Sequence, residues 1–282
     1  MHLQNSNSAD KANLFKSLHH NDKILVLPNV WDPLGARLLE SLGYNAVATA
    51  SASIAFSNDY ADGENIPFKD LISILKKIVD SVKIPVTADI ESGYASNIKT
   101  LEENIKQLID TGISGINIED SLHDDSNMVS VDAQCEKINC IKLIALKMGV
   151  SIFINARTDV YINENHLSPE EKLSEAIHRG KAYKDAGADG FYPIVLKEKE
   201  SMENIVQEVG LPVNILLIPG IPDFEILQKI GIARVSLGPG FLKIAINAMK
   251  NIAEKLLNQD GMMEVMENPV TTVFLAKLIS GN

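Results

Sequence analysis

Short apolar runs rich in β-branched residues alternate with longer amphipathic stretches along most of the chain. Short apolar runs bounded by turn residues predict strands, and apolar positions spaced three and four apart predict helices. The predicted strands begin at Ile24, Asn45, Pro85, Gly115, Ser151, Gly190, Val213 and Arg234. The predicted helices cover residues 32–42, 68–82, 98–110, 132–148, 169–186 and 223–230.

Strands that alternate with helices pair in parallel, and parallel strands covered on both faces are apolar along most of their length. Here the strands begin apolar, and polar residues gather at their carboxyl ends, as on the catalytic rim of a barrel. We therefore predict one α/β domain over residues 1–282, a (β/α)8 TIM barrel with a C-terminal helical extension. A doubly wound open sheet is the alternative, but no glycine-rich turn follows the first strand.

The extension covers residues 241–282 and is longer than one barrel helix requires. It contains a predicted helix over 241–257, a polar break over 258–268 and a last apolar segment over 269–279. Its apolar side packs either on its own barrel or on a partner subunit, and length alone favours neither.

Composition narrows the function classes. The 282 residues carry a net charge of −11, which disfavours nucleic acid and anionic membranes as partners because both require a basic surface. The N-terminus has no apolar signal segment, and no apolar run approaches the length of a membrane span. The two cysteines, Cys135 and Cys140, lie in one predicted helix and form neither a disulfide framework nor a metal motif. We expect a cytoplasmic protein.

Acidic residues cluster at the predicted strand ends. Asp89 and Glu91 lie two apart and therefore face the same way on a strand, Glu119 ends the next strand, and Asp62 lies in the loop after the second. Carboxylates side by side in a cleft require a cation to stay ionised. Oxygen ligands on adjacent strand ends suit Mg²⁺ or Mn²⁺, and the alternative is a solvated acidic rim.

Asn155, Arg157 and Asp159 share one face at the end of the fifth strand. A guanidinium at this position can bind a substrate carboxylate through two hydrogen bonds and stabilise the negative charge of an enolate. The alternative is a purely structural ion pair of Arg157 with Asp159 or Glu119.

Three further features are weaker signals. Small residues from Thr49 to Ser53 allow backbone N–H groups to approach an anionic ligand. Asn214 begins the seventh strand, from which its side chain could reach inward. His123 follows Glu119 in a loop that could cover the mouth, where it is either a general acid or a plain loop histidine. His19 and His20 are typical of a solvated helix end.

Together these residues resemble the isocitrate lyase / phosphoenolpyruvate mutase superfamily, from Asn29 to about Gly240. The matching motifs, in order, are NVWD, SAS…DG, TADIESGY, GINIEDS, NARTD and PVN. The order and co-occurrence of these motifs are specific to the superfamily, whereas each motif alone is weak.

The resemblance implies an α/β barrel whose last helix swaps between subunits, in a dimer or dimer of dimers. It implies a metal site at Asp62, Asp89, Glu91 and Glu119, with Asp89 as a direct ligand. It also implies a substrate site that includes Ser51 and Ala52 as backbone donors, Asp62, Asn155, Asn214 and Arg157.

The loop after the fourth strand departs from the best-known members. It contains no cysteine, which disfavours isocitrate and methylisocitrate cleavage. It carries Asp125 before Asn127 where the phosphonopyruvate enzymes carry a lysine before an asparagine, which disfavours mutase chemistry.

We therefore expect a Mg²⁺-dependent lyase that acts on a small 2-oxo or 2-hydroxy carboxylate, with water or His123 protonating the enolate. The alternatives are cleavage or rearrangement of a P–C bond, a Schiff-base aldolase that uses Lys197, and a carboxylate-binding protein that has lost catalysis. Lys197 lies in a charged run that more simply predicts a solvated helix start.

Overall fold

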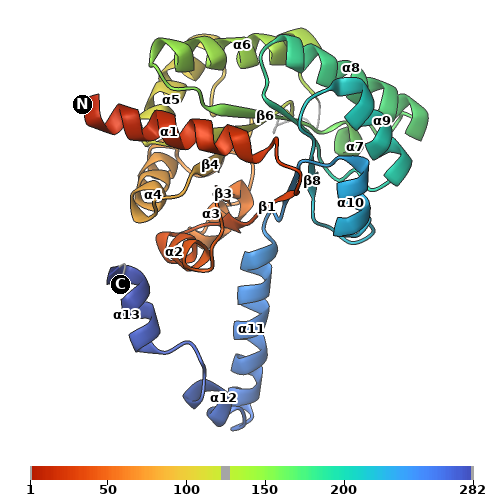
Figure 1. The fold of residues 1–282 in the computed structure, drawn as a ribbon. Helices are drawn as coiled ribbons and strands as arrows, with labels where there is room; N and C mark the ends of the chain where they lie inside the picture. The colour runs from red at the N-terminus through yellow and green to blue at the C-terminus, as the bar shows by residue number, and fades with distance from the viewer. Residues whose placement is uncertain (1, 122–127, 281–282) are drawn as a thin grey trace.

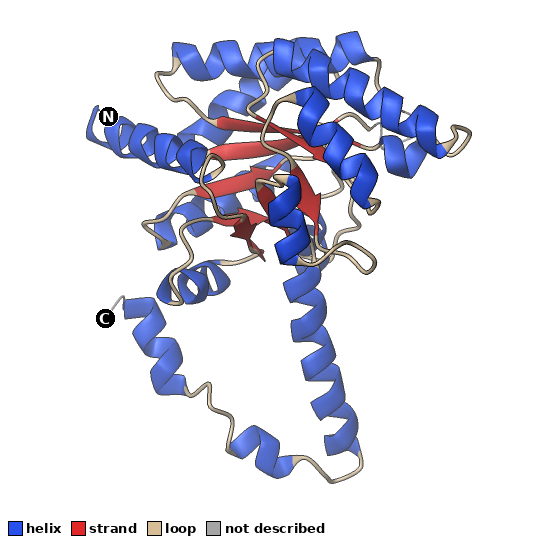
Figure 2. Cartoon of the chain, turned by 45° about the vertical axis from the view of Figure 1, so that its right-hand side comes forward, coloured by secondary structure: helices blue, strands red, loops and turns tan. Residues whose placement is uncertain are grey.

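The computed structural model describes residues 2–121 and 128–280. Its parallel strands form the centre of the molecule, and helices surround them (Figures 1 and 2). The strands are β1 Leu25–Leu27, β2 Asn29–Val30, β3 Val47–Thr49, β4 Val86–Asp89, β5 Gly115–Glu119, β6 Phe153–Thr158, β7 Gly190–Pro193, β8 Asn214–Leu216 and β9 Arg234–Ser236.

Two hydrogen-bonded ladders contain all of these strands: β2-β3-β4-β5-β6-β7 and β1-β9-β8. Pro28 separates β1 from β2 within one extended segment, because proline has no N–H to donate to a ladder. On the other side, a parallel bridge between Phe191 and Val213 connects β7 to the segment that leads into β8. The eight predicted strand positions therefore follow one another around a (β/α)8 barrel, as predicted, and the open-sheet alternative is wrong.

The helices alternate with the strands and pack their apolar sides on the barrel. In α4, Leu71, Leu75 and Ile78 recur at helical spacing and are buried. Burying each such side chain contributes about 1.5–3 kcal/mol. The helices are α1 His2–Leu18, α2 Pro33–Ser41, α3 Ser51–Ser57, α4 Phe68–Ser81, α5 Ile98–Asp110, α6 Val131–Lys147, α7 Val160–Asn163, α8 Pro169–Asp185, α9 Lys199–Val209, α10 Phe224–Ile230, α11 Gly240–Leu257, α12 Met262–Met266 and α13 Thr272–Ser280.

Helix α1, which the sequence pattern did not predict, covers the end of the barrel where the strands begin (Figure 1). Its Phe15 packs edge-on against Phe153, and the His19 ring stacks on Phe153 with centroids 3.9 Å apart. A side chain at Gly115 would overlap Phe15 and the Phe153 backbone, so glycine allows this close packing. The expectation that His19 is solvated is wrong, because its ring is 5% exposed.

Burial of His19 makes stability depend on pH. Burial is the main cause that lowers the pKa of folded His19 to about 3, and the Arg234 charge adds to this effect. In the unfolded chain, histidine has a pKa of about 6.5. The stability that neutral His19 provides is therefore complete above the unfolded pKa and is lost as the pH falls below it. Between pH 8 and pH 5, we expect wild type to lose about 2 kcal/mol more unfolding free energy than His19→Phe.

Urea unfolding at the two pH values measures this difference. His20 is exposed on the same helix end, so His20→Phe serves as the matched control and should follow wild type. An equal pH response of wild type and His19→Phe would contradict the assignment.

The extension leaves the barrel after β9 as α11, continues into α12 and returns as α13, which lies beside α2 (Figure 1). Arg37 of α2 donates a hydrogen bond from Nη1 to the Leu278 carbonyl oxygen, 3.2 Å away. The helix predicted over 241–257 is present as α11, and the apolar segment over 269–279 contains α13. Helices α11, α12 and α13 contain no buried residues.

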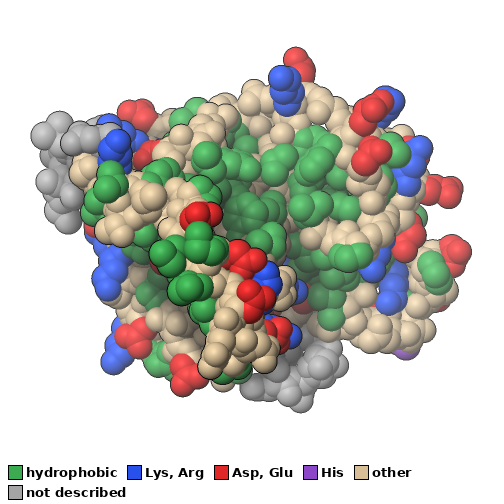
Figure 3. Space-filling view, turned by 90° about the horizontal axis from the view of Figure 1, so that it is seen from below, with side chains coloured by type: hydrophobic (Ala, Val, Ile, Leu, Met, Phe, Trp, Pro, Cys, Tyr) green, Lys and Arg blue, Asp and Glu red, His purple; other side chains and the backbone are tan. Residues whose placement is uncertain are grey.

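Figure 3 views the molecule from the side of the extension and shows apolar side chains gathered over this face. The large exposed apolar side chains of the extension are Ile244, Ile246, Met249, Leu256, Leu257, Met262, Met263, Val265, Met266, Val270, Val273, Phe274 and Ile279. No helix within the described residues has both the length and the apolar character to cross a membrane.

Candidate active site

A cavity of about 210 Å³ opens among the carboxyl ends of the barrel strands. Its lining is Asn29, Thr49, Ala50, Ser51, Ala52, Asp62, Asp89, Asn117, Arg157, Tyr192, Ile194, Leu216, Arg234, Ser236, Gly238 and Pro239. A larger groove of about 530 Å³ lies among α1, α4 and α5 at the opposite end, and none of the predicted site residues lines it. The small cavity is the candidate site.

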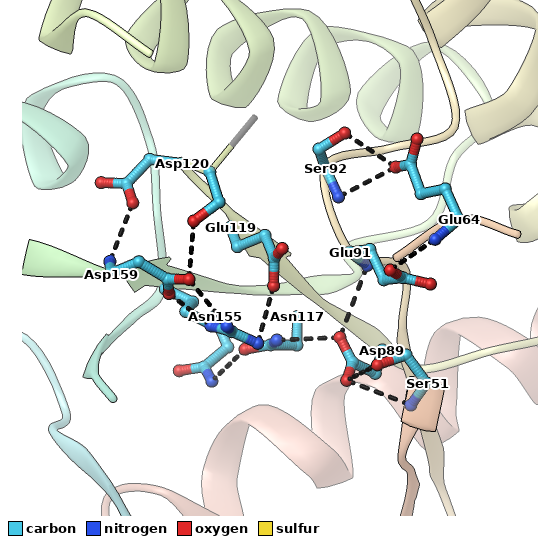
Figure 4. Close-up of polar contacts among 12 residues, drawn as sticks. Ser51, Glu64, Asp89, Glu91, Ser92, Asn117, Glu119, Asp120, Asn155 and Asp159 are labelled. Carbon is cyan, nitrogen blue, oxygen red and sulfur yellow. Dashed lines mark hydrogen bonds and ion pairs between the residues drawn. The ribbon is translucent and has the colours of Figure 1, made fainter. Parts of the chain in front are cut away.

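Asp89, the last residue of β4, lines this cavity and is held by neutral donors. Ser51 donates to its Oδ2 from the backbone N (3.2 Å) and from Oγ (3.0 Å), and Asn117 Nδ2 donates to its Oδ1 at 3.0 Å (Figure 4). Among the described residues, no lysine or arginine forms a salt bridge with Asp89. Its carboxylate is thus fixed in position without a protein counter-ion in contact.

Asn155 supports the position of Asp89 indirectly, through Asn117. It is 1% exposed and donates from Nδ2 to Asn117 Oδ1 at 3.0 Å, so the order Asn155, Asn117, Asp89 forms a chain across three strands (Figure 4). Asn155 does not line the cavity. The structure places it where it orients Asn117, while direct contact with a substrate stays a prediction.

Glu91 lies after β4 in a turn and not on the strand itself, because its φ is +50°. Its carboxyl accepts hydrogen bonds from the Glu64 backbone N at 2.7 Å and from the Tyr94 hydroxyl at 2.9 Å. Burial, followed by the charges of Asp89 and Asp62, raises the pKa of Glu91 to about 8. Three carboxyl groups therefore influence one another at this rim, and a bound cation would relieve their mutual repulsion.

Arg157 of β6 is held on two sides by carboxylates. Its Nη1 is 2.6 Å from Glu119 Oε2, and its Nε and Nη2 donate to the two oxygens of Asp159 at 2.6 and 2.8 Å. Burial alone would lower the pKa of Arg157, but Glu119 and Asp159 raise it above its ordinary value. Burial also raises the pKa of Glu119, and the Arg157 charge opposes that rise. The Arg157 side chain remains 16% exposed, and the residue lines the cavity.

Asp159 is itself fixed by a buried network. Its Oδ2 accepts from the Ser121 hydroxyl at 2.6 Å, and its backbone N donates to Asp120 Oδ1 at 2.9 Å (Figure 4). Asp120 Oδ2 in turn accepts from the Tyr183 hydroxyl at 2.6 Å and pairs with Arg179 Nη1 at 3.2 Å. Helix α8 thereby anchors the group that orients Arg157.

The cavity residues that sequence reasoning missed include Arg234 and Tyr192. Arg234 is 3% exposed in β9, and Tyr192 is 5% exposed in β7. Arg234 had a usable signal, since a charged residue at the start of a short strand covered on both faces breaks the apolar pattern. Tyr192 had none, because an aromatic residue in a strand is ordinary.

The other predicted residues are placed as follows. Ser51, Ala52 and Asp62 line the cavity. Burial, followed by the Asp89 charge, raises the pKa of Asp62. Asn214 begins β8 and is buried below the cavity, where its Oδ1 accepts from the Ser236 hydroxyl at 3.1 Å.

Three predictions concern residues elsewhere. His123 and the gating-loop residues 122–127 lie outside the described residues. Lys197 is exposed and does not line the cavity, so its surroundings give it none of the desolvation that a Schiff-base lysine requires. Cys135 and Cys140 are free thiols on α6, as predicted.

The donor set fits a hard divalent cation that keeps most of its water. Within residues 2–121 and 128–280, no three Asp, Glu, His or Cys side chains converge closely enough to enclose an ion. Mg²⁺ is commonly bound through only one or two carboxylates and several waters. Asp89 and Asp62, which both line the cavity, would meet that requirement.

A family profile that matches most of the chain shows which family the protein belongs to. The sequence profile described as phosphoenolpyruvate phosphomutase matches residues 15–257. The chain belongs to this family. Its relatives include lyases, decarboxylases and phosphonate enzymes, so the predicted superfamily membership and enzyme class are confirmed.

Three relatives show how varied these activities are. An uncharacterized protein of Mycobacterium tuberculosis is 30% identical over 225 residues, 79% of this chain and 81% of that one. The 2-methylisocitrate lyase of Halalkalibacterium halodurans is 24% identical over 93% of this chain and 86% of its own. The oxaloacetate decarboxylase of Pseudomonas entomophila is 26% identical over 78% of this chain and 75% of its own.

Solved structures of the family share the fold. A Burkholderia cenocepacia protein provisionally assigned as a phosphonomutase is 34% identical, with a TM-score of 0.83 over 87% of this chain and 99% of that one. A phosphonopyruvate hydrolase in complex with oxalate and Mg²⁺ is 19% identical, with a TM-score of 0.83 over 96% of this chain and 95% of its own. At 19% identity the second comparison supports the fold alone.

Proposed function

We propose that this protein is a Mg²⁺-dependent lyase that cleaves a C–C bond of a small 2-oxo or 2-hydroxy carboxylate. The observation that carries the proposal is the cavity lined by both Asp89, which has no contacting counter-ion among the described residues, and Arg157, which is a fixed buried cation. Relatives that are named as a methylisocitrate lyase and an oxaloacetate decarboxylase support this reaction class.

Asp89 would hold the metal ion, and Asp62, Glu91 and Glu119 would bind its waters. When bound, such an ion supplies Lewis-acid stabilisation of an enolate oxygen. Burial is the largest cause of the raised Glu91 pKa, and the Asp89 and Asp62 charges add to it, so a bound cation would relieve the repulsion among these carboxyl groups. Mn²⁺ accepts the same oxygen ligands and would serve as well.

Arg157 would bind the substrate carboxylate and the developing enolate. Arg157 donates hydrogen bonds from Nε and Nη2 to Asp159, and its Nη1 pairs with Glu119, so the guanidinium is held in place before substrate binds. A preorganised cation stabilises charge without reorganising during the reaction. Ser51 and Ala52 line the same cavity, where their backbone N–H groups would contribute to binding the substrate carboxylate.

A substrate panel tests the activity. We would assay oxaloacetate, 2-methylisocitrate, 2,3-dimethylmalate and phosphonopyruvate with Mg²⁺ and with a chelator, and identify the products by mass spectrometry. Metal-dependent C–C cleavage of one of them is expected. Phosphate release from phosphonopyruvate would instead support the second candidate, P–C bond chemistry, which the family profile and the 34% identical Burkholderia protein favour.

We also propose that the extension joins subunits into a dimer or dimer of dimers. Helix α11 carries exposed Ile244, Ile246 and Met249, and apolar side chains left in water contribute no burial energy to hold the helix. Met249→Glu is expected to convert the assembly to a smaller species in sedimentation velocity. Lys250→Glu, at an exposed neighbouring position, should leave the assembly intact. A single monomeric species for all three proteins would contradict this proposal.

A further inference from the structure

Arg234 extends along the inside of the barrel toward the cavity. It begins β9, and its Nε donates to the Oγ of Ser236, two residues nearer the carboxyl end of the strand, at 2.9 Å. The Ser236 hydroxyl donates onward to Asn214 Oδ1 at 3.1 Å, which fixes this contact. The side chain is therefore aimed at the mouth, and the residue lines the same cavity as Asp89 and Arg157.

The Arg234 guanidinium has no carboxylate partner among the described residues, although it is almost completely buried. Its Nη1 is inaccessible to solvent and makes no hydrogen bond within the described part of the chain. The other two buried guanidinium groups of the barrel are paired: Arg157 with Glu119 and Asp159, and Arg179 with Asp120 and Glu175. A buried, unpaired charge is costly, so a residue of this kind is expected to have a function that offsets its cost.

The surroundings of Arg234 favour an anion. Burial lowers its pKa to about 10, which leaves the group protonated at neutral pH, and the Tyr192 hydroxyl and the Asp89 charge oppose that fall. Asp89, Arg157 and Arg234 come from β4, β6 and β9 and thus face the cavity from separate sides. One carboxylate of a ligand can bind near Asp89 and Arg157 while a second carboxylate of the same ligand binds Arg234.

We propose that Arg234 binds a second carboxylate of the substrate, remote from the 2-oxo or 2-hydroxy acid group. This inference rests on the proposed function and narrows its substrate class to dicarboxylates. The cavity of about 210 Å³ is a small one, which favours a small dicarboxylate over a long one. Arg234 is then a residue that determines substrate specificity.

Malate and lactate form a matched pair of probes, because malate is lactate with one added carboxylate and neither loses CO₂ spontaneously. Isothermal titration with Mg²⁺ would measure both against wild type, Arg234→Met and Arg234→Lys. We expect wild type to bind malate at least about tenfold more tightly than lactate. Arg234→Met should bind malate only as tightly as lactate, and Arg234→Lys should retain part of the preference. Lys197→Met, at an exposed position outside the cavity, should behave as wild type.

Unliganded stability provides a readout that does not depend on activity. Because Arg234→Met removes an unpaired buried charge, its midpoint of thermal unfolding without ligand should equal or exceed that of wild type. A variant that fails to fold or melts several degrees lower would show a structural arginine and overturn the inference. An unchanged malate-to-lactate preference in Arg234→Met would overturn it as well.

Oxalate binding distinguishes a failure of the Arg234 role from a failure of the proposed function. Oxalate is small enough to use only the Asp89 and Arg157 sides, so Mg²⁺-dependent oxalate binding should be equal in wild type and Arg234→Met. Equal oxalate binding with no malate preference in wild type refutes the role of Arg234 and leaves the proposed function intact. Absence of metal-dependent oxalate binding in wild type refutes the proposed function itself.

Discussion

Asp89→Asn is expected to lower kcat/KM at least about 10³-fold, which corresponds to about 4 kcal/mol of transition-state stabilisation. The amide retains the shape of the side chain and can still accept hydrogen bonds from Ser51, but it removes the charge that would hold the metal. Removing the Asp89 charge relieves part of what raises the pKa of Glu91, burial being the larger cause. The amide nitrogen would face the Asn117 Nδ2 donor and lose that hydrogen bond, so the unfolding free energy should change by no more than about 1 kcal/mol while activity is lost.

Steady-state assays on the identified substrate, combined with urea unfolding, test both parts. Asp80→Asn is the matched control, because Asp80 is an exposed carboxylate on α4 that pairs with Lys76 and does not line the cavity. It should retain wild-type turnover. Full turnover by Asp89→Asn would show that the acidic rim is not the reacting site.

Arg157→Met is expected to destabilise the fold by about 3–5 kcal/mol at pH 8, in addition to abolishing turnover. Glu119 and Asp159 would then be buried without their shared cation, and each side chain is only 5% exposed. Loss of the Arg157 charge would raise the pKa of Glu119 further, and a carboxyl group with a raised folded-state pKa regains stability as the pH falls through that value. The loss should therefore be smaller at pH 5 than at pH 8.

Urea unfolding of wild type, Arg157→Met and Arg157→Lys at both pH values measures this effect. The lysine variant keeps the charge but cannot form the bidentate contact with Asp159. Relative to Arg157→Met, it should therefore recover part of the stability and little of the turnover. A destabilisation below about 1 kcal/mol for Arg157→Met, or one that does not change with pH, would contradict the ion-pair account.

The strands and the acidic rim could be predicted because their signals are local. An apolar run that ends in Asp89 or Glu119 identifies both a strand and its carboxyl end, and parallel topology brings those ends together. Other features depend on contacts that are distant in sequence. His19 is buried because Phe153, far along the chain, stacks on it, and a pattern limited to the N-terminus could not show that.

Backbone conformation explains the departure at Glu91. Strand alternation predicted that it would share a face with Asp89, but β4 ends at Asp89 and the chain turns through a positive φ at Glu91. Positive φ is uncommon in residues other than glycine, and a sequence pattern does not reveal it. Arg234 was overlooked for a different reason, since its position at the start of a strand placed it away from the expected rim.

Thermal unfolding with oxalate, with and without Mg²⁺, tests whether Asp89 and Arg157 form a metal-dependent carboxylate site, because a ligand that binds only the folded state raises the unfolding midpoint by mass action. Oxalate resembles a pyruvate enolate and accompanies Mg²⁺ in the structure of the phosphonopyruvate hydrolase relative. We predict a rise with oxalate that requires Mg²⁺ and that Asp89→Asn abolishes. No metal-dependent rise in wild type would contradict the account and favour a carboxylate-binding protein that has lost catalysis.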